Sequence, residues 1–175
     1  RISRPLAESI AAEMGESLGE PNLSEFSNGE IHCRFSESIR GCDVFIIQTH
    51  CHEPGSSIND ALMEQLIMVD AARRASAKRI TVVCPHYGYA RQDRKSSGRE
   101  PITAKLVANL FKEAGASRLV SVDLHSGQIQ GFFDGPVDHL TAMPVLVDRL
   151  RTLQGDLAIV SPDAGRVKVA ERYAI

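Results

Sequence analysis

The stretch that decides the fold is Ile80-Thr81-Val82-Val83-Cys84, a short and mostly apolar run between two segments of helical periodicity. The segment before it spans residues 60–74, and the one after it spans residues 101–114. An apolar strand between two helices is typical of βαβ units, whose strands are parallel and buried on both faces. The sequence therefore predicts an α/β fold.

The same alternation continues outward from this strand. An amphipathic helix is expected near the start, where Leu6, Ile10, Met14 and Leu18 recur four apart, and it should end near Gly19. The other expected elements are strands at 31–35, 44–47, 119–122 and 157–160 and a helix at 143–153. Together they predict a parallel sheet with helices on both faces. We expect residues 1–155 to form one domain and residues 156–175 to begin a second, truncated one.

The composition is that of an ordinary globular protein. The 175 residues are 43% hydrophobic and carry a net charge of −2, so no overall basic field favours nucleic acid or an anionic membrane as a partner. No apolar run approaches the roughly 20 residues that a membrane span needs. The four cysteines include no CxxC pair, which favours reduced thiols in a cytoplasmic protein. His50-Cys51-His52 lacks a second ligand cluster, and we interpret it as chance loop composition.

A cluster of cations follows the strand at 80–84. Arg91, Arg94, Lys95 and Arg99 lie within nine residues, in a segment that leads to the next helix. In parallel sheets ligands bind beyond the carboxyl ends of the strands, where such a cluster could hold a polyphosphate through charge-assisted hydrogen bonds. Charge alone favours a solvated loop. The position of the cluster makes the two interpretations about equal.

Carboxylates and one imidazole follow the later strands. Asp123 and His125 alternate after the strand at 119–122, Asp134 and Asp138 come next, and Asp163 follows the strand expected at 157–160. Mg²⁺ prefers a few carboxylates together with water and substrate phosphates, so these side chains could hold Mg²⁺ with a nucleotide. From spacing alone, strand-end capping by Asp123 with a hydrogen-bonded His125 is somewhat favoured. For Asp163 the alternative is an ordinary helix N-cap, which is common. The chain has no Walker loop, GxGxxG, GxSxG or HExxH motif, so any ATP would bind outside those plans.

Several ordered stretches resemble one known family. They are Phe26-Ser27-Asn28-Gly29-Glu30, Arg40-Gly41-Cys42-Asp43 through Gln48, Gly88-Tyr89-Ala90-Arg91-Gln92-Asp93-Arg94-Lys95, and Asp123-Leu124-His125 through Gln128-Ile129-Gln130-Gly131-Phe132-Phe133-Asp134. On these residues the chain is similar to the amino-terminal half of ribose-phosphate diphosphokinases, also called phosphoribosyl pyrophosphate synthetases. The similarity extends over nearly the whole chain.

The resemblance implies a phosphoribosyltransferase-like fold and Mg²⁺-dependent transfer of pyrophosphate from ATP to the 1-hydroxyl of ribose 5-phosphate. It implies homo-oligomers, usually hexamers. It assigns contacts with the adenine of ATP, often across a subunit boundary, to Phe26, Asn28 and Glu30. It also assigns ATP binding to Arg91 and Gln92 and to the segment that continues them, Asp93, Arg94 and Lys95. It assigns Mg²⁺ to His125 and Asp163 and, in some members, also to Asp123, Asp134 and Asp138.

The chain departs from the family pattern at three places. Asn28 stands where many members have Asp, Arg166 stands where many have Gly, and the loop at 50–58 is longer than usual. Both ends look cut, so the catalytic Lys/Arg loop and the ribose-phosphate loop are expected beyond residue 175, and the chain alone is expected to be inactive. Two alternatives stay open: a non-catalytic regulatory relative, and a phosphoribosyltransferase.

Overall fold

A computed structural model describes residues 3–174, which belong to two compact units. The first unit spans Arg1–Leu140 and the second spans Thr141–Ile175, and each is described by itself. The predicted domain boundary after residue 155 stays a prediction. None of the helices in the described part of the chain is long and apolar enough to cross a membrane.

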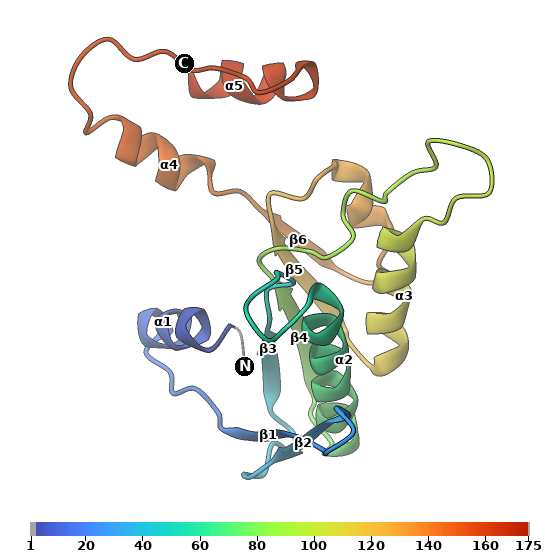
Figure 1. The fold of residues 1–175 in the computed structure, drawn as a ribbon. Helices are drawn as coiled ribbons and strands as arrows, with labels where there is room; N and C mark the ends of the chain where they lie inside the picture. Colours follow the sequence, from blue (N-terminus) through green and yellow to red (C-terminus); the bar gives the residue numbers. More distant parts are fainter. Residues whose placement is uncertain (1–2, 175) are drawn as a thin grey trace. The chain divides into compact units, whose positions relative to one another are not determined.

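A four-stranded parallel sheet forms the centre of the first unit (Figure 1). Its strands are β3 (Asp43–Ile47), β4 (Arg79–Cys84), β5 (Arg118–Val122) and β6 (Val137–Leu140), and they pair in this order. The predicted α/β class is confirmed. Because all four strands are parallel, their carboxyl ends meet at one edge of the sheet, which we call the carboxyl edge.

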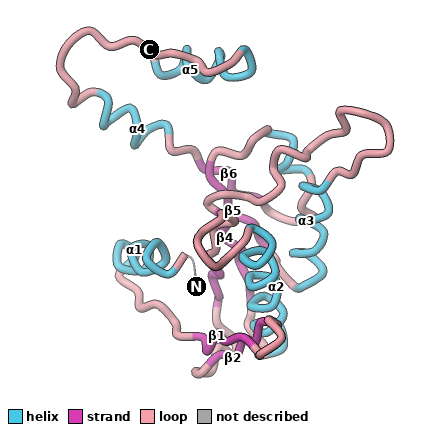
Figure 2. Tube along the Cα trace, in the orientation of Figure 1, coloured by secondary structure: helices cyan, strands magenta, loops and turns pink. Residues whose placement is uncertain are grey.

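Helices α2 (Ile58–Arg74) and α3 (Thr103–Ala114) lie side by side on one side of this sheet (Figure 2). The first turn of α2 is fixed by a capping box, in which Ser57 and Asp60 exchange side-chain and backbone hydrogen bonds. Such a box satisfies backbone N–H groups that the first turn leaves without helical partners. Both α2 and α3 begin and end within two residues of the predicted bounds.

The core lies between these helices and the sheet. Val69 of α2, Val107 and Phe111 of α3, Val82 of β4 and Leu119 of β5 are at most 1% exposed. Burial of side chains of this size contributes about 1.5–3 kcal/mol each. The other face of the sheet is less covered. Helix α1 (Arg4–Met14) lies on that side of β3 in Figure 1, but Phe45 of β3 remains 55% exposed.

Helix α1 ends earlier than predicted. The apolar repeat extends to Leu18, but Gly15 adopts a left-handed conformation with φ of 69° and ends the helix at Met14. The N–H of Glu16 then bonds to the carbonyl of Ala11, as in a Schellman motif. The repeat predicted the helix, and the backbone freedom of Gly15 decided its end.

A separate two-stranded hairpin precedes the sheet. Its strands β1 (Pro21–Glu25) and β2 (Ile31–Phe35) pair antiparallel, and β2 packs against α2. The sequence predicted β2 and missed β1, whose polar residues hide the strand. It also missed β6, in which Asp138 and His139 interrupt the apolar pattern.

The second unit is helical. It contains α4 (Met143–Leu150), the 3-10 turn η2 (Ala164–Arg166) and α5 (Val167–Tyr173). The strand predicted at 157–160 is wrong: this segment forms no strand, and Val160 is 82% exposed. An apolar run becomes a strand only where a partner offers backbone hydrogen bonds. The described residues of this unit, 141–174, contain no other strand.

Candidate functional site

Three segments meet the carboxyl edge of the sheet. The first is the segment from Gln48 to His50 after β3, and the second is the long loop between β4 and α3, residues 85–102, which we call the cation loop. The third is the Asp123-Leu124-His125 turn after β5. In Figure 1 the cation loop, drawn yellow-green, extends well beyond the sheet. This edge is where ligands bind in parallel α/β folds.

The cation loop presents its charges to solvent. Arg91, Arg94, Lys95 and Arg99 are all exposed, and among residues 3–174 no carboxylate forms an ion pair with any of them. Guanidinium and ammonium groups without a protein counter-ion attract anions, and Arg suits phosphate because its N–H groups match two phosphate oxygens. The loop thus offers a local positive surface on a protein whose net charge is −2.

The base of the cation loop is fastened to its surroundings. The Tyr87 hydroxyl donates to the carbonyl of Ala104 at 2.9 Å, and the N–H of Ala104 donates to the carbonyl of Gln92 at 3.1 Å. The Thr103 hydroxyl donates to the side-chain carbonyl of Gln92. Gln92 is therefore held against the start of α3, while Arg91 beside it stays exposed.

Asp93 is buried and points toward the segment that follows β5. Its carboxylate accepts hydrogen bonds from the Ser126 hydroxyl and, at 3.0 Å, from the Gln128 amide. The Ser126 bond, followed by weaker contributions that include Gln128, lowers the pKa of Asp93 below its usual value, so the group is charged at neutral pH. This contact ties the cation loop to the segment that carries Asp123 and His125.

Asp123 and His125 lie at the end of β5, and both are exposed. Asp123 has a positive φ of 45°, an uncommon conformation for a residue other than glycine. Between them Leu124 is buried, and its N–H donates to Nε2 of His139 at 2.9 Å. His139 thereby fixes a turn that directs Asp123 and His125 away from the core.

The remaining predicted metal residues do not belong to this turn. Asp138, within β6, pairs with Arg118 at 2.7 Å. Asp134 lies in the turn before β6, at the amino ends of the strands. Asp163 belongs to the second unit, where its side chain makes no capping hydrogen bond to η2, so ordinary capping does not explain it. Within residues 3–174 no three His, Cys, Asp or Glu side chains cluster as a complete metal site.

The Phe26–Glu30 segment forms the turn of the hairpin. The N–H of Phe26 donates to the carbonyl of Glu30, Asn28 caps the turn through the N–H of Glu30, and Gly29 has φ of 87°. Phe26 is 56% exposed and contacts His32 edge-on. In Figure 1 this turn lies beside the carboxyl-terminal half of α2, away from the carboxyl edge. Within this chain it does not join the cation loop.

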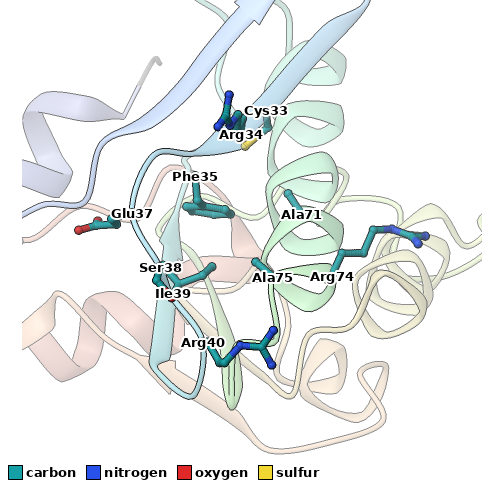
Figure 3. Close-up of a pocket in the computed structure, with 10 residues that line it drawn as sticks. All are labelled: Cys33, Arg34, Phe35, Glu37, Ser38, Ile39, Arg40, Ala71, Arg74 and Ala75. Atoms are coloured by element: carbon teal, nitrogen blue, oxygen red, sulfur yellow. The ribbon is translucent and has the colours of Figure 1, made fainter.

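A pocket of about 410 Å³ lies under the hairpin (Figure 3). It is bordered by β2, by the segment from Glu37 to Arg40 and by α2, and Arg34, Arg40 and Arg74 are among its residues. Because α2 runs antiparallel to the strands, its carboxyl-terminal end places this pocket toward their amino ends. The pocket is distinct from the site at the carboxyl edge.

His50 is the residue that the sequence interpretation missed. We assigned it to chance loop composition, yet it is fully buried at the end of β3 and bonds to the cation loop. Its position in the sequence could have identified it, because it lies just after a predicted strand, at the edge of the sheet where ligands bind. A histidine at this position can hold neighbouring segments through hydrogen bonds, even where it binds no metal.

This fold and edge define a class of protein, the parallel α/β domain that carries its ligand-facing groups on loops after the strands. A family model described as the N-terminal domain of ribose phosphate pyrophosphokinase matches residues 1–115. The chain belongs to this family, and the resemblance found in the sequence is confirmed.

Its relatives agree on the enzyme. The chain is 57% identical to ribose-phosphate pyrophosphokinase of Bifidobacterium longum and 54% identical to that of Corynebacterium glutamicum, and each match covers 99% of this chain. These matches cover 51% and 53% of the relatives, so the chain spans about half their length. The crystal structure of phosphoribosylpyrophosphate synthetase from Mycobacterium smegmatis superposes with a TM-score of 0.91 and 54% identity, over 97% of this chain and 56% of that one.

Proposed function

We propose that this chain supplies the ATP-binding part of an enzyme that transfers pyrophosphate from ATP to the 1-hydroxyl of ribose 5-phosphate. In this reaction the hydroxyl attacks the β-phosphorus of ATP and AMP leaves. The observation that carries the proposal is a cation loop with four exposed charges that form no ion pair within residues 3–174. Asp93 fastens this loop to the segment after β5, which bears Asp123 and His125. The names of the relatives support the choice of substrates.

The residues have separate tasks in this proposal. Arg91, Arg94 and Lys95 offset the charge of the triphosphate, and Gln92, held at the start of α3, fixes the backbone beside Arg91. Transfer at phosphorus needs positioning and charge neutralisation more than covalent chemistry from the protein. Asp93 takes the role of a clamp rather than a ligand contact, because its carboxylate is already occupied by Ser126 and Gln128.

The donors at the carboxyl edge fit Mg²⁺. One exposed carboxylate and one exposed imidazole form a sparse set, which suits an ion held mainly by water and substrate phosphates. We propose Asp123 and His125 of the first unit for this task. Asp163, in the second unit, is proposed separately as a residue associated with Mg²⁺. Asp134 and Asp138 are left out because one lies at the amino ends of the strands and the other is paired with Arg118. Bound Mg²⁺ would neutralise charge on the phosphates of ATP.

The adenine contacts require a second copy of the chain. Phe26, Asn28 and Glu30 lie on the hairpin turn, away from the cation loop of the same chain (Figure 1). We therefore propose that the turn of one copy completes the nucleotide site of another, in a homo-oligomer. The exposed ring of Phe26 at the tip of a hairpin suits stacking on a base.

The test uses the longest natural form of the protein. AMP formation from ATP and ribose 5-phosphate is measured with and without Mg²⁺, and we expect AMP only when both substrates and the ion are present. Absence of AMP would favour a non-catalytic relative. Release of pyrophosphate from phosphoribosyl pyrophosphate in the presence of a base, without AMP formation, would favour a phosphoribosyltransferase.

A further inference from the structure

The imidazole of His50 lies at the junction of four elements. It follows β3, it bonds to Gln65 of α2, it stacks on Phe111 of α3 with ring centroids 6.0 Å apart, and it bonds to Gly88 of the cation loop. Its side chain is fully buried. Such a position is unusual for a histidine that binds no metal, and each of its polar atoms needs a partner.

The hydrogen bonds fix the tautomer of His50. The side-chain N–H groups of Gln65 donate to the carbonyls of Ile46 at 2.9 Å and Val83 at 3.3 Å, so its side-chain oxygen faces His50. That oxygen lies 2.8 Å from Nε2, which must therefore donate. Nδ1 carries no proton and accepts the N–H of Gly88 at 2.9 Å.

Gly88 is fitted closely to the same ring. A Cβ at position 88 would lie 3.0 Å from the Cβ of His50 and 3.1 Å from its Nδ1, closer than ordinary contact. The contact and the hydrogen bond thus fix the backbone three residues before Arg91. The N–H of His50 adds a bond to the carbonyl of His86 at 3.1 Å. One side-chain hydrogen bond, one backbone hydrogen bond and one close contact join His50 to the start of the cation loop.

We infer that His50 is a positioning residue, whose Nδ1 holds Gly88 and thereby sets the path of the cation loop. The inference rests on the proposed function for its consequence, which is that Arg91 and Gln92 meet ATP in the right place. His50 itself is fully buried. It acts only through the backbone of the loop.

Two substitutions separate positioning from packing. The side-chain oxygen of His50→Asn can take the place of Nδ1 and keep the bond to Gly88, while the Gln65 bond is lost. In His50→Gln the longer side chain reaches the place of Nε2 and keeps the Gln65 bond, while Gly88 is released. Each variant loses one buried hydrogen bond, so a purely structural role predicts the same effect for both. His52→Gln, an exposed histidine two residues away, is the control.

The readouts are amide exchange at Gly88 and affinity for a non-hydrolysable ATP analogue. We expect the Gly88 amide to exchange about tenfold faster in His50→Gln than in His50→Asn. We expect His50→Gln also to bind the analogue about three- to tenfold more weakly than His50→Asn does. Both differences correspond to the loss of one hydrogen bond. The amide of Leu119, bonded to Pro136, reports global unfolding and corrects for it. Equal exchange at Gly88 in the two variants would overturn the inference.

If the variants fail to fold, a measurement on the unaltered protein tests the positioning role of His50. A scalar coupling between the Gly88 amide nitrogen and Nδ1 of His50 is expected by NMR, and its absence would contradict the inference. The proposed function is judged separately. If the unaltered protein does not bind the analogue, that function fails, while the Gly88 exchange and coupling still decide the positioning role.

Discussion

The carboxylate of Asp93 accepts a hydrogen bond from the hydroxyl of Ser126, 33 positions further along the chain. This bond joins the two loops that carry the candidate phosphate and metal groups. Separate loops at a sheet edge would otherwise move independently, and catalysis by positioning needs them in register. The contact therefore makes the two halves of the site one structural unit.

Asp93→Ala should loosen both loops at once. It removes the acceptor of two hydrogen bonds, and we expect a loss of about 1–2 kcal/mol in the free energy of unfolding. Amide exchange should rise in the cation loop and also in the segment after β5. Glu100→Ala is the matched control, because Glu100 accepts from Ser96 and Ser97 within the cation loop alone. If both variants affect the segment after β5 equally, Asp93 is not a clamp.

Arg91→Ala should weaken ATP binding while leaving ribose 5-phosphate binding nearly unchanged. The lost charge-assisted contact contributes roughly 1.5–3 kcal/mol, or about ten- to a hundredfold in affinity. Calorimetry with an ATP analogue and, separately, with ribose 5-phosphate measures the two effects in the longest natural form. Lys78→Ala, an exposed cation just before β4, should change neither. An equal loss for both ligands would count against the assignment of Arg91.

His125→Ala and Asp163→Ala should alter the Mg²⁺ requirement without unfolding the protein. Both side chains are exposed, so the free energy of unfolding should change by no more than about 0.5 kcal/mol. AMP formation measured against Mg²⁺ concentration should show a higher half-saturating concentration in each variant. An unchanged Mg²⁺ dependence would refute the metal role. Unfolding under mild conditions would instead indicate a structural role for that residue.

The stability of the protein should fall as pH decreases from 7 to 5, partly because of His50. Burial, opposed by the Gln65 bond and reinforced by nearby His86, lowers the pKa of His50 from 6.5 to about 4. Between these values the unfolded chain binds a proton that the folded chain does not, so stability is complete above pH 6.5 and is lost toward pH 4.

For His50 alone this loss amounts to about 1–2 kcal/mol at pH 5. Urea unfolding at pH 7, 6 and 5 measures it. The same series is measured with His50→Asn, whose side chain does not titrate. The carboxylates contribute equally to the pH dependence of the two proteins, so the difference between them reports His50. A pH dependence that is the same in both proteins would show that His50 does not bind the extra proton on unfolding.

The sequence predicted the sheet well because its strands are apolar runs separated by helical patterns. It failed where polar residues or missing partners decided the outcome. Asp138 and His139 concealed β6, and the run at 157–160 found no strand to pair with. In the site, the exposure of Arg91 and His125 followed from their positions after strands. The inward turn of Asp93 could not be predicted, because it depends on Ser126 and Gln128, which are distant in the chain.

The close fit between His50 and Gly88 also constrains how members of this family can diverge. A side chain at position 88 has no room while an imidazole held by Gln65 and Phe111 occupies position 50. Relatives with a small residue at position 50 would free that space, and with it the need for glycine. Substitutions at these two positions should therefore occur together among homologues, so that evolution preserves the path of the loop and not either residue.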